Sequence, residues 1–144
     1  MKITICGSLA FSKDMGGIAE KLNNLGHEVL LPASTAKILA GIFDQGEIDS
    51  EKGTKAAADR VIKNNSIVNH YKKIESSDAI LVLNYDKKGI PGYIGGNTFL
   101  EMGFAYVNNK KIFLWDIIPD MPYRDELEAM QPNVINKDLS KLKL

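Results

Sequence analysis

A single carboxylate interrupts an otherwise apolar helical segment. Residues 92–107 read GYIGGNTFLEMGFAYV, a glycine-rich turn that opens a predicted helix from about Thr98 to Asn108, and Glu101 is the only acidic residue in it. On the first turn of that helix, free backbone N–H groups and the helix dipole would keep the Glu101 carboxylate ionised even when shielded from water. Such a carboxylate is suited to attack an anomeric carbon. We therefore predict that Glu101 is a nucleophile.

The spacing of Thr98 and Glu101 also allows a purely structural interpretation. Thr98-Phe-Leu-Glu101 has the pattern of a capping box, in which each side chain accepts a hydrogen bond from the backbone N–H of the other residue. On spacing alone the two interpretations have equal weight. Gly95 and Gly96, followed by Asn97, favour a binding site, because glycines before a helix let a ligand approach the backbone closely.

Three polar residues flank the apolar run 79–83 and are candidate partners of Glu101. Asn84 and Asp86 follow this predicted strand, on the side where parallel sheets bind their ligands. Asp78 precedes the strand, so its side chain is expected to hydrogen-bond local backbone. Position therefore favours Asn84 or Asp86 over Asp78.

Two loops have residues suited to ligand binding. Gly7 and Ser8, with Lys13 shortly after them, belong to a predicted strand-to-helix turn that can receive an anion or a sugar hydroxyl. This turn has neither the glycine motif of dinucleotide folds nor a Walker loop, so no cofactor is expected. Tyr85 and Tyr93 flank a later loop and are candidates for stacking on a base, although loop tyrosines also commonly cover core.

The histidines and the cysteine do not predict a metal site. His27 and His70 lie far apart in the sequence and have no cysteine or carboxylate at ligand spacing. His70 is expected to be a surface or capping residue of a helix rather than a catalytic base. Cys6 lies in a predicted strand and is expected to be a buried, inert thiol, which fits the reducing cytosol.

The composition predicts one cytoplasmic domain spanning residues 1–144, with 44% hydrophobic and 25% charged residues. Eighteen basic residues balance eighteen acidic ones, so neither a nucleic acid polymer nor a membrane surface is favoured as a partner. The N-terminal residues do not have the pattern of a signal peptide. No apolar stretch approaches the roughly 18 residues that a membrane span needs.

Strands and helices are predicted to alternate, which is typical of a single doubly wound, flavodoxin- or Rossmann-like α/β domain with a mostly parallel sheet of about five strands. Residues 33–58 show no sustained period and are expected to form a partly ordered connection, either a lid or binding loop or a disordered segment. The predicted strands are 2–6, 28–31, 79–83, 111–115 and 133–135, and the predicted helices are 14–25, 59–75, 98–108 and 125–130.

Three segments together resemble the nucleoside 2-deoxyribosyltransferase superfamily, which includes the deoxynucleoside monophosphate N-glycosidases. They are ICGSLAF, SSDAILVLN and GGNTFLEMGFAYVNNKKIFLW, and the resemblance spans residues 2 to about 118. It implies that Glu101 forms a covalent glycosyl intermediate and that Asp78 contacts the base and assists its departure, against the positional preference for Asn84. It also implies a homodimer or higher homo-oligomer.

The sequence departs from the family pattern at three places. Thr4 stands where many members have a tyrosine on the first strand, and Tyr85 or Tyr93 can compensate. Ala10 replaces the arginine that helps the N-glycosidases hold a 5′-phosphate, leaving Lys13 as the nearby cation. Asn69 or His70 replaces an aspartate on the helix before the third strand.

The sequence therefore predicts an enzyme that acts on a small nucleoside or nucleoside 5′-monophosphate. In two steps, Glu101 displaces the base at C1′, and water or a second base then attacks from the same face. One alternative is a cytokinin-type phosphoribohydrolase, whose glycine-rich motif is similar to residues 95–101. Another is a non-catalytic nucleotide-sensing module.

Overall fold

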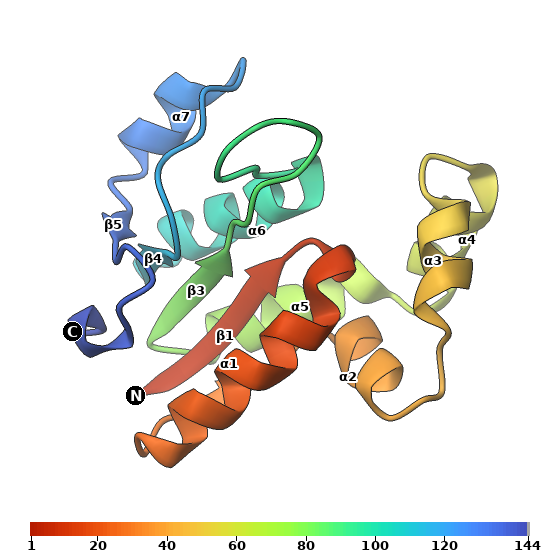
Figure 1. The fold of residues 1–144 in the computed structure, drawn as a ribbon, viewed down its shortest axis with the longest axis horizontal. Helices are drawn as coiled ribbons and strands as arrows, with labels where there is room; N and C mark the ends of the chain where they lie inside the picture. The colour runs from red at the N-terminus through yellow and green to blue at the C-terminus, as the bar shows by residue number, and fades with distance from the viewer. Residues whose placement is uncertain (144) are drawn as a thin grey trace.

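The computed structural model describes residues 1–143, and its centre is a five-stranded sheet in which all neighbouring strands run parallel. The strands lie in the order β2-β1-β3-β4-β5 (Figure 1). This is the flavodoxin-like order, in which the chain reverses direction across the sheet between β1 and β3. The predicted doubly wound α/β fold is confirmed. The strands are β1 (Lys2–Gly7), β2 (Glu28–Leu30), β3 (Ala79–Leu83), β4 (Lys111–Leu114) and β5 (Asn133–Val134).

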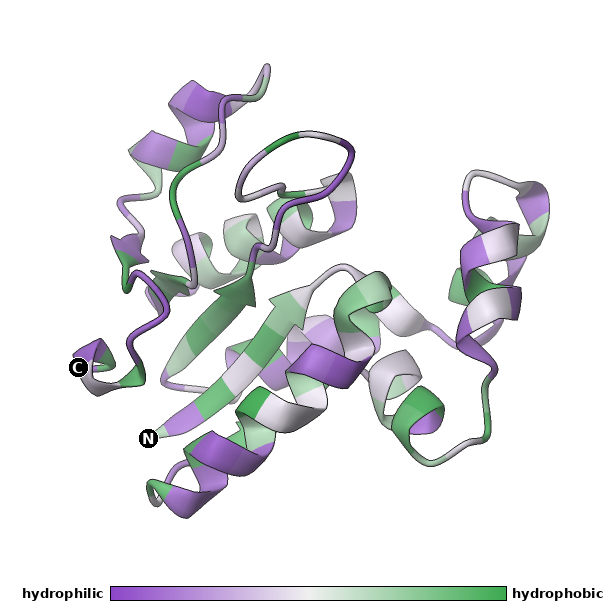
Figure 2. Ribbon diagram, viewed as in Figure 1, coloured by the Kyte–Doolittle hydropathy of each residue, from purple (hydrophilic) through white to green (hydrophobic). Residues whose placement is uncertain are grey.

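Alternating side chains of the central strands enter two separate cores, one on each face of the sheet. Ile3, Ile5 and Leu81 pack on one face against the helix α1 (Ser12–Asn24). Cys6 and Val82 face the other side, where α5 (Ser66–Glu75) and α6 (Gly96–Val107) cover the sheet. Every residue of β3 is buried, which explains why its sequence AILVL is apolar throughout. Figure 2 shows this hydrophobic character concentrated on the central strands.

The segment predicted as one helix over 59–75 is two helices. The helix α4 (Lys55–Lys63) ends at Asn64, and α5 begins after Asn65, whose φ of 47° is left-handed. The Asn64 amide donates to the Arg60 carbonyl over 2.9 Å, and the Asn69 amide donates to the Asn64 carbonyl over 3.0 Å. Asparagine tolerates the left-handed region and satisfies backbone groups at helix ends, so this pair breaks the helix.

Residues 33–58 are helical apart from short connections at 40–44 and 52–54, and the expectation of a partly ordered connection was wrong. They form α2 (Ala33–Leu39), α3 (Gln45–Glu51) and the first residues of α4. Asp44 caps α3 by accepting from the Glu47 N–H over 2.9 Å. The pair α3 and α4, hereafter the α3–α4 hairpin, stands to one side of the sheet (Figure 1, yellow).

The remaining elements follow β4. The helix α7 (Arg124–Ala129) precedes β5, and two short 3-10 helices span Leu9–Phe11 and Leu139–Lys141. Within residues 1–143, no helix has both the length and the apolar character required to cross a membrane.

Candidate active site

A cavity of about 340 Å³ lies beyond the carboxyl end of β1, between the sheet, the α3–α4 hairpin and the starts of α5 and α6. In a sheet with this strand order, the crevice next to the β1–β3 switch is the place where ligands bind. Its walls come from five stretches of chain, namely residues 7–10, 32–34, 48–61, 66–70 and 93–104.

Glu101 lines this cavity and is almost completely buried, with 5% of its surface exposed. Its Oε1 accepts a hydrogen bond from the Asn97 side-chain amide over 3.2 Å and lies 3.5 Å from Nε2 of His70. Its Oε2 is also buried and has no hydrogen-bond partner among residues 1–143. One oxygen of the carboxyl group is thus held in place while the other remains free for a ligand.

Glu101 is on the second turn of α6, not the first, because the helix begins two residues earlier than predicted. The N-cap is Gly95, with φ −80° and ψ 169°, and no side chain caps this helix end. Thr98 lies within α6 rather than at its N-cap, and its side chain is buried and lines the cavity. The capping-box interpretation of Thr98 and Glu101 is therefore wrong.

The expectation that Glu101 is held ionised is also wrong. Burial raises the pKa of Glu101 to about 8, because little water remains to solvate a carboxylate. Burial, aided by the nearby charge of Lys73, lowers the pKa of His70 to about 4. At neutral pH the two groups face each other as a carboxylic acid and a neutral imidazole.

His70 was missed by sequence reasoning, which placed it at the surface. Only 7% of its surface is exposed, and it lines the cavity beside Glu101. The sequence feature that could have predicted its burial is its position four residues before Ile74, since the two share the buried face of α5. Cys6 is fully buried as predicted, but its thiol belongs to the same group, with Sγ 3.5 Å from Nε2 of His70. Burial first, and then the proximity of Glu101, raise the pKa of Cys6.

The structure places most of the predicted binding residues on the cavity wall. Ser8 follows β1, and its hydroxyl accepts a hydrogen bond from Lys87 Nζ over 2.8 Å. At Gly7, φ is +153°, which residues with a side chain rarely adopt, and a Cβ atom would lie 3.0 Å from the Leu83 carbonyl oxygen, so this turn favours glycine. The predicted residues that line the cavity are Gly7, Ser8, Tyr93, Gly95, Gly96, Asn97, Thr98 and Glu101.

Asn84, the favoured partner of Glu101, instead holds two loops together. It is buried, and its side-chain amide donates to the carbonyl oxygens of Gly92 and Ile117 over 3.1 and 2.8 Å. Its Oδ1 accepts from the Asp116 N–H over 2.9 Å. All of its polar side-chain atoms are engaged by backbone, and it does not line the cavity formed by the described residues.

The other predicted residues also lie outside the lining of this cavity. Asp78 is at the opposite end of β3, where its carboxylate accepts from the Lys2 N–H over 2.7 Å. Asp86 accepts from the Gly92 N–H over 2.9 Å. The Tyr85 ring packs against Phe11 and Trp115, and Lys13 is exposed on α1.

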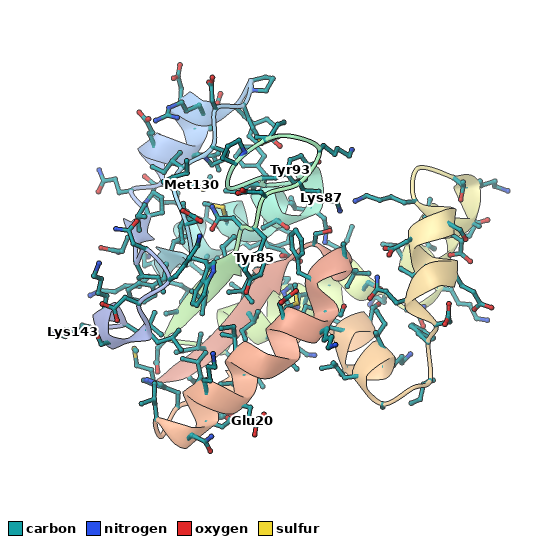
Figure 3. All side chains as sticks on the ribbon, viewed as in Figure 1. Glu20, Tyr85, Lys87, Tyr93, Met130 and Lys143 are labelled. Atoms are coloured by element: carbon teal, nitrogen blue, oxygen red, sulfur yellow. The ribbon has the colours of Figure 1, made fainter. Side chains whose placement is uncertain are left out.

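Three cations that sequence reasoning did not select lie at the cavity. Lys52 and Arg60 of the α3–α4 hairpin line it, and Arg60 forms an ion pair with Glu51. Lys87 reaches it from the loop between β3 and α6 through its hydrogen bond to Ser8. Burial and the proximity of Lys52 lower the pKa of Lys87 to about 8. Figure 3 shows Lys87 beside Tyr93, on the side of that loop that faces the hairpin.

The fold and the cavity together define a doubly wound α/β protein with a buried carboxyl group at its ligand crevice. No family model and no curated protein match the chain. Among solved structures, the chain is similar to a 2-deoxyribosyltransferase from the psychrotolerant bacterium Bacillus psychrosaccharolyticus. The two are 21% identical, with a TM-score of 0.47, and the match covers 79% of this chain and 71% of the other. At this identity and TM-score no assignment of chemistry follows from the comparison, and any such assignment depends on the cavity itself.

Proposed function

We propose that this protein cleaves or transfers the N-glycosidic bond of a (deoxy)ribonucleoside or its 5′-monophosphate, with Glu101 as the nucleophile. The observation that carries the proposal is the unpartnered, buried Oε2 of Glu101 on a cavity wall. A volume of about 340 Å³ is in the range of small-molecule sites. The motif resemblance of residues 2 to about 118 supports the same chemistry.

In this mechanism the carboxyl group must lose its proton before it attacks. His70 Nε2 lies 3.5 Å from Glu101 Oε1, but its lowered pKa of about 4 makes it a weaker base than the Glu101 carboxylate, so we assign this proton to solvent rather than to His70. The oxocarbenium-like charge that develops at C1′ then stabilises the carboxylate in a site with little water. The bond between C1′ and the base breaks as the bond between C1′ and Glu101 forms. Water or a second base then attacks C1′ and frees Glu101.

The leaving base also needs a proton. Solvent supplies this proton, and Asp49 of α3, the other carboxyl group among the described residues that line the cavity, is assigned the contact with the base in place of Asp78. Tyr93 supplies a ring on the cavity wall against which a base can stack. Lys52 and Lys87, with the Ser8 hydroxyl, are the groups suited to hold a 5′-phosphate.

The test is to incubate the protein with a panel of nucleosides and nucleoside 5′-monophosphates and to measure free base by chromatography. Glu101→Gln keeps the size of the side chain and removes its nucleophilicity, so base release should fall by at least 1000-fold. Glu20→Gln, an exposed change on α1, is the matched control and should retain full activity. Retention of activity in Glu101→Gln contradicts the proposal.

One observation favours a second candidate, a nucleotide-sensing module. Neither Asp78 nor Asn84 reaches the cavity, so the carboxyl partner implied by the family resemblance does not lie beside Glu101. Measurable nucleotide binding by calorimetry, combined with no base release from any member of the panel, would support the sensor and exclude the enzyme.

A further inference from the structure

Three side chains that can all ligate a metal meet where His70 and Glu101 line the cavity, with Cys6 buried behind them. Cys6 ends the buried part of β1, His70 comes from α5 and Glu101 from α6. Nε2 of His70 is 3.5 Å from the Cys6 sulfur and 3.5 Å from Oε1 of Glu101. One ligand atom from each residue lies within 4.8 Å of the other two. The sheet and both helices on its second face therefore converge on one point.

These separations match the edges of a tetrahedral zinc site. Zn²⁺ binds sulfur at about 2.3 Å, histidine nitrogen at about 2.0–2.1 Å and carboxylate oxygen at about 2.0–2.2 Å. With tetrahedral angles, neighbouring ligand atoms are then roughly 3.3–3.6 Å apart. The S–N and N–O separations, both 3.5 Å, already fall in this range. The third separation is between the Cys6 sulfur and the Glu101 carboxylate. A rotation of the Glu101 side chain, whose Oε2 has no partner among residues 1–143, can shorten it.

The burial of the three groups provides an independent reason to expect a ligand. Their exposed fractions are 0% for Cys6, 7% for His70 and 5% for Glu101. Polar atoms this deep are normally satisfied by hydrogen bonds, yet Oε2 of Glu101 has none among the described residues. A thiolate, an imidazole and a carboxylate together suit Zn²⁺ and disfavour Mg²⁺ and Ca²⁺, which take oxygen ligands.

We propose that Cys6, His70 and Glu101 bind one Zn²⁺ ion, whose fourth coordination position opens into the cavity. Binding forms the Zn–S, Zn–N and Zn–O bonds and releases the thiol and carboxyl protons to solvent. The site goes beyond the proposed glycosyl chemistry and needs no substrate. Because a zinc-bound Glu101 is not available to attack C1′, zinc and nucleoside would compete for the same carboxylate.

The composition of the chain makes a spectroscopic test specific. The chain has one cysteine and two histidines, so a thiolate-to-cobalt charge-transfer band can arise only from Cys6. The experiment titrates Co²⁺ into full-length protein that has been stripped with EDTA and dialysed against metal-free buffer. We expect one Co²⁺ per chain, the charge-transfer band, the visible bands of tetrahedral cobalt, and their loss when one equivalent of Zn²⁺ is added.

Matched variants separate the site from surface binding. His70→Ala and Glu101→Gln should each weaken Co²⁺ binding at least tenfold, whereas His27→Ala and Glu20→Gln should leave it unchanged. Circular dichroism of each variant shows whether it is folded. The spectrum of the unmodified protein decides the question even if a variant fails to fold. Absence of the thiolate band at saturating Co²⁺, or full binding by folded His70→Ala, overturns the proposal. No substrate is present, so failure of the glycosyl reaction does not affect the result.

Discussion

At the scale of single residues, burial has more influence on Glu101 than its place in a helix. A helix N-terminus stabilises a carboxylate by about 0.3–1 kcal/mol and acts within the first turn. Glu101 is one turn further along, and burial raises its pKa from 4.5 to about 8, a much larger effect. The same burial keeps His70 neutral. Two groups that would form an ion pair at the surface therefore coexist here as an uncharged acid and base.

This arrangement predicts how stability depends on pH. The pKa of Glu101 is raised on folding from 4.5 to about 8, so its stabilising contribution is lost as the pH rises through about 8. The pKa of His70 is lowered from 6.5 to about 4, so its contribution is lost as the pH falls through about 4. Above about pH 6.5 His70 is largely neutral in both the folded and the unfolded state, so of these two groups Glu101 makes the larger change. The free energy of unfolding should therefore fall by on the order of 1–2 kcal/mol between pH 6.5 and 8.

The measurement is urea unfolding at several pH values in the presence of EDTA, so that metal binding does not contribute. Glu101→Gln should not show the decline between pH 6.5 and 8, whereas Glu20→Gln should show it in full. If the unmodified protein and Glu101→Gln have parallel profiles over this range, Glu101 is not a buried neutral acid.

A second prediction at this scale concerns Lys87. If Lys87 holds a 5′-phosphate, Lys87→Gln removes a charge-assisted hydrogen bond worth about 1.5–3 kcal/mol, which weakens nucleoside monophosphate binding at least tenfold. Binding of the unphosphorylated nucleoside should change little. Lys13→Gln is the control, because Lys13 is exposed on α1 and does not line the cavity. Isothermal titration calorimetry on both variants measures the effect, and equal losses for nucleoside and monophosphate would exclude Lys87 from phosphate recognition.

At the scale of elements, Asn84 joins the loops that follow β3 and β4. Replacing it with alanine leaves the carbonyl oxygens of Gly92 and Ile117 and the N–H of Asp116 without their present partners. Asn84→Ala should therefore lower the free energy of unfolding by about 2–5 kcal/mol. Asn23→Ala, on the exposed side of α1, should stay within about 1 kcal/mol of the unmodified protein. Thermal melts compare the two, and a small loss for Asn84→Ala would show that the loops do not depend on this side chain.

The elements that sequence reasoning predicted well are those in which local pattern and tertiary burial agree. The strand predicted over 79–83 and the helix predicted over 14–25 both form, as β3 and α1, and all of β3 is buried, as are Ile18 and Leu22 of α1. Residues 33–58 were harder to predict, because α2 and α3 are short and each buries a single residue, which is Thr35 in α2 and Ile48 in α3. Helices this short depend on tertiary contacts more than on their own periodicity. The break at Asn65 was missed because helical spacing continues across it.

At the scale of the whole molecule, the site is created by topology rather than by a local motif. Cys6, His70 and Glu101 are separated by 64 and 31 positions along the chain, and only the order β2-β1-β3 and the placement of α5 and α6 bring them together. Glu101 was found because its surroundings in the sequence are unusual for a carboxylate. His70 and Cys6 look ordinary in sequence, and their chemistry depends on what the fold places next to them.

The α3–α4 hairpin is the part of the molecule most suited to respond to a ligand. It supplies Asp49, Lys52 and Arg60 to the cavity wall. Its own anchoring is slight, since Ile48 is the one buried residue of α3 and no residue of Lys55–Lys63 is buried. Segments with few buried apolar side chains open locally at low free energy. A ligand that contacts both the hairpin and α6 adds contacts that the free protein does not have.

Amide hydrogen exchange should therefore slow in residues 45–63 when a nucleoside 5′-monophosphate saturates the cavity, by a factor that grows with ligand concentration. The helix α1 lies on the other face of the sheet. Its amide protons should therefore exchange at an unchanged rate, except for those that exchange only when the whole protein unfolds. Using Glu101→Gln prevents turnover during the measurement, so the comparison is made on one bound state. Uniform protection of the hairpin and α1 would indicate global stabilisation alone. Protection limited to the hairpin would show that a nucleotide is held between α3–α4 and the end of the sheet, where Glu101 and Lys87 can act on the same molecule.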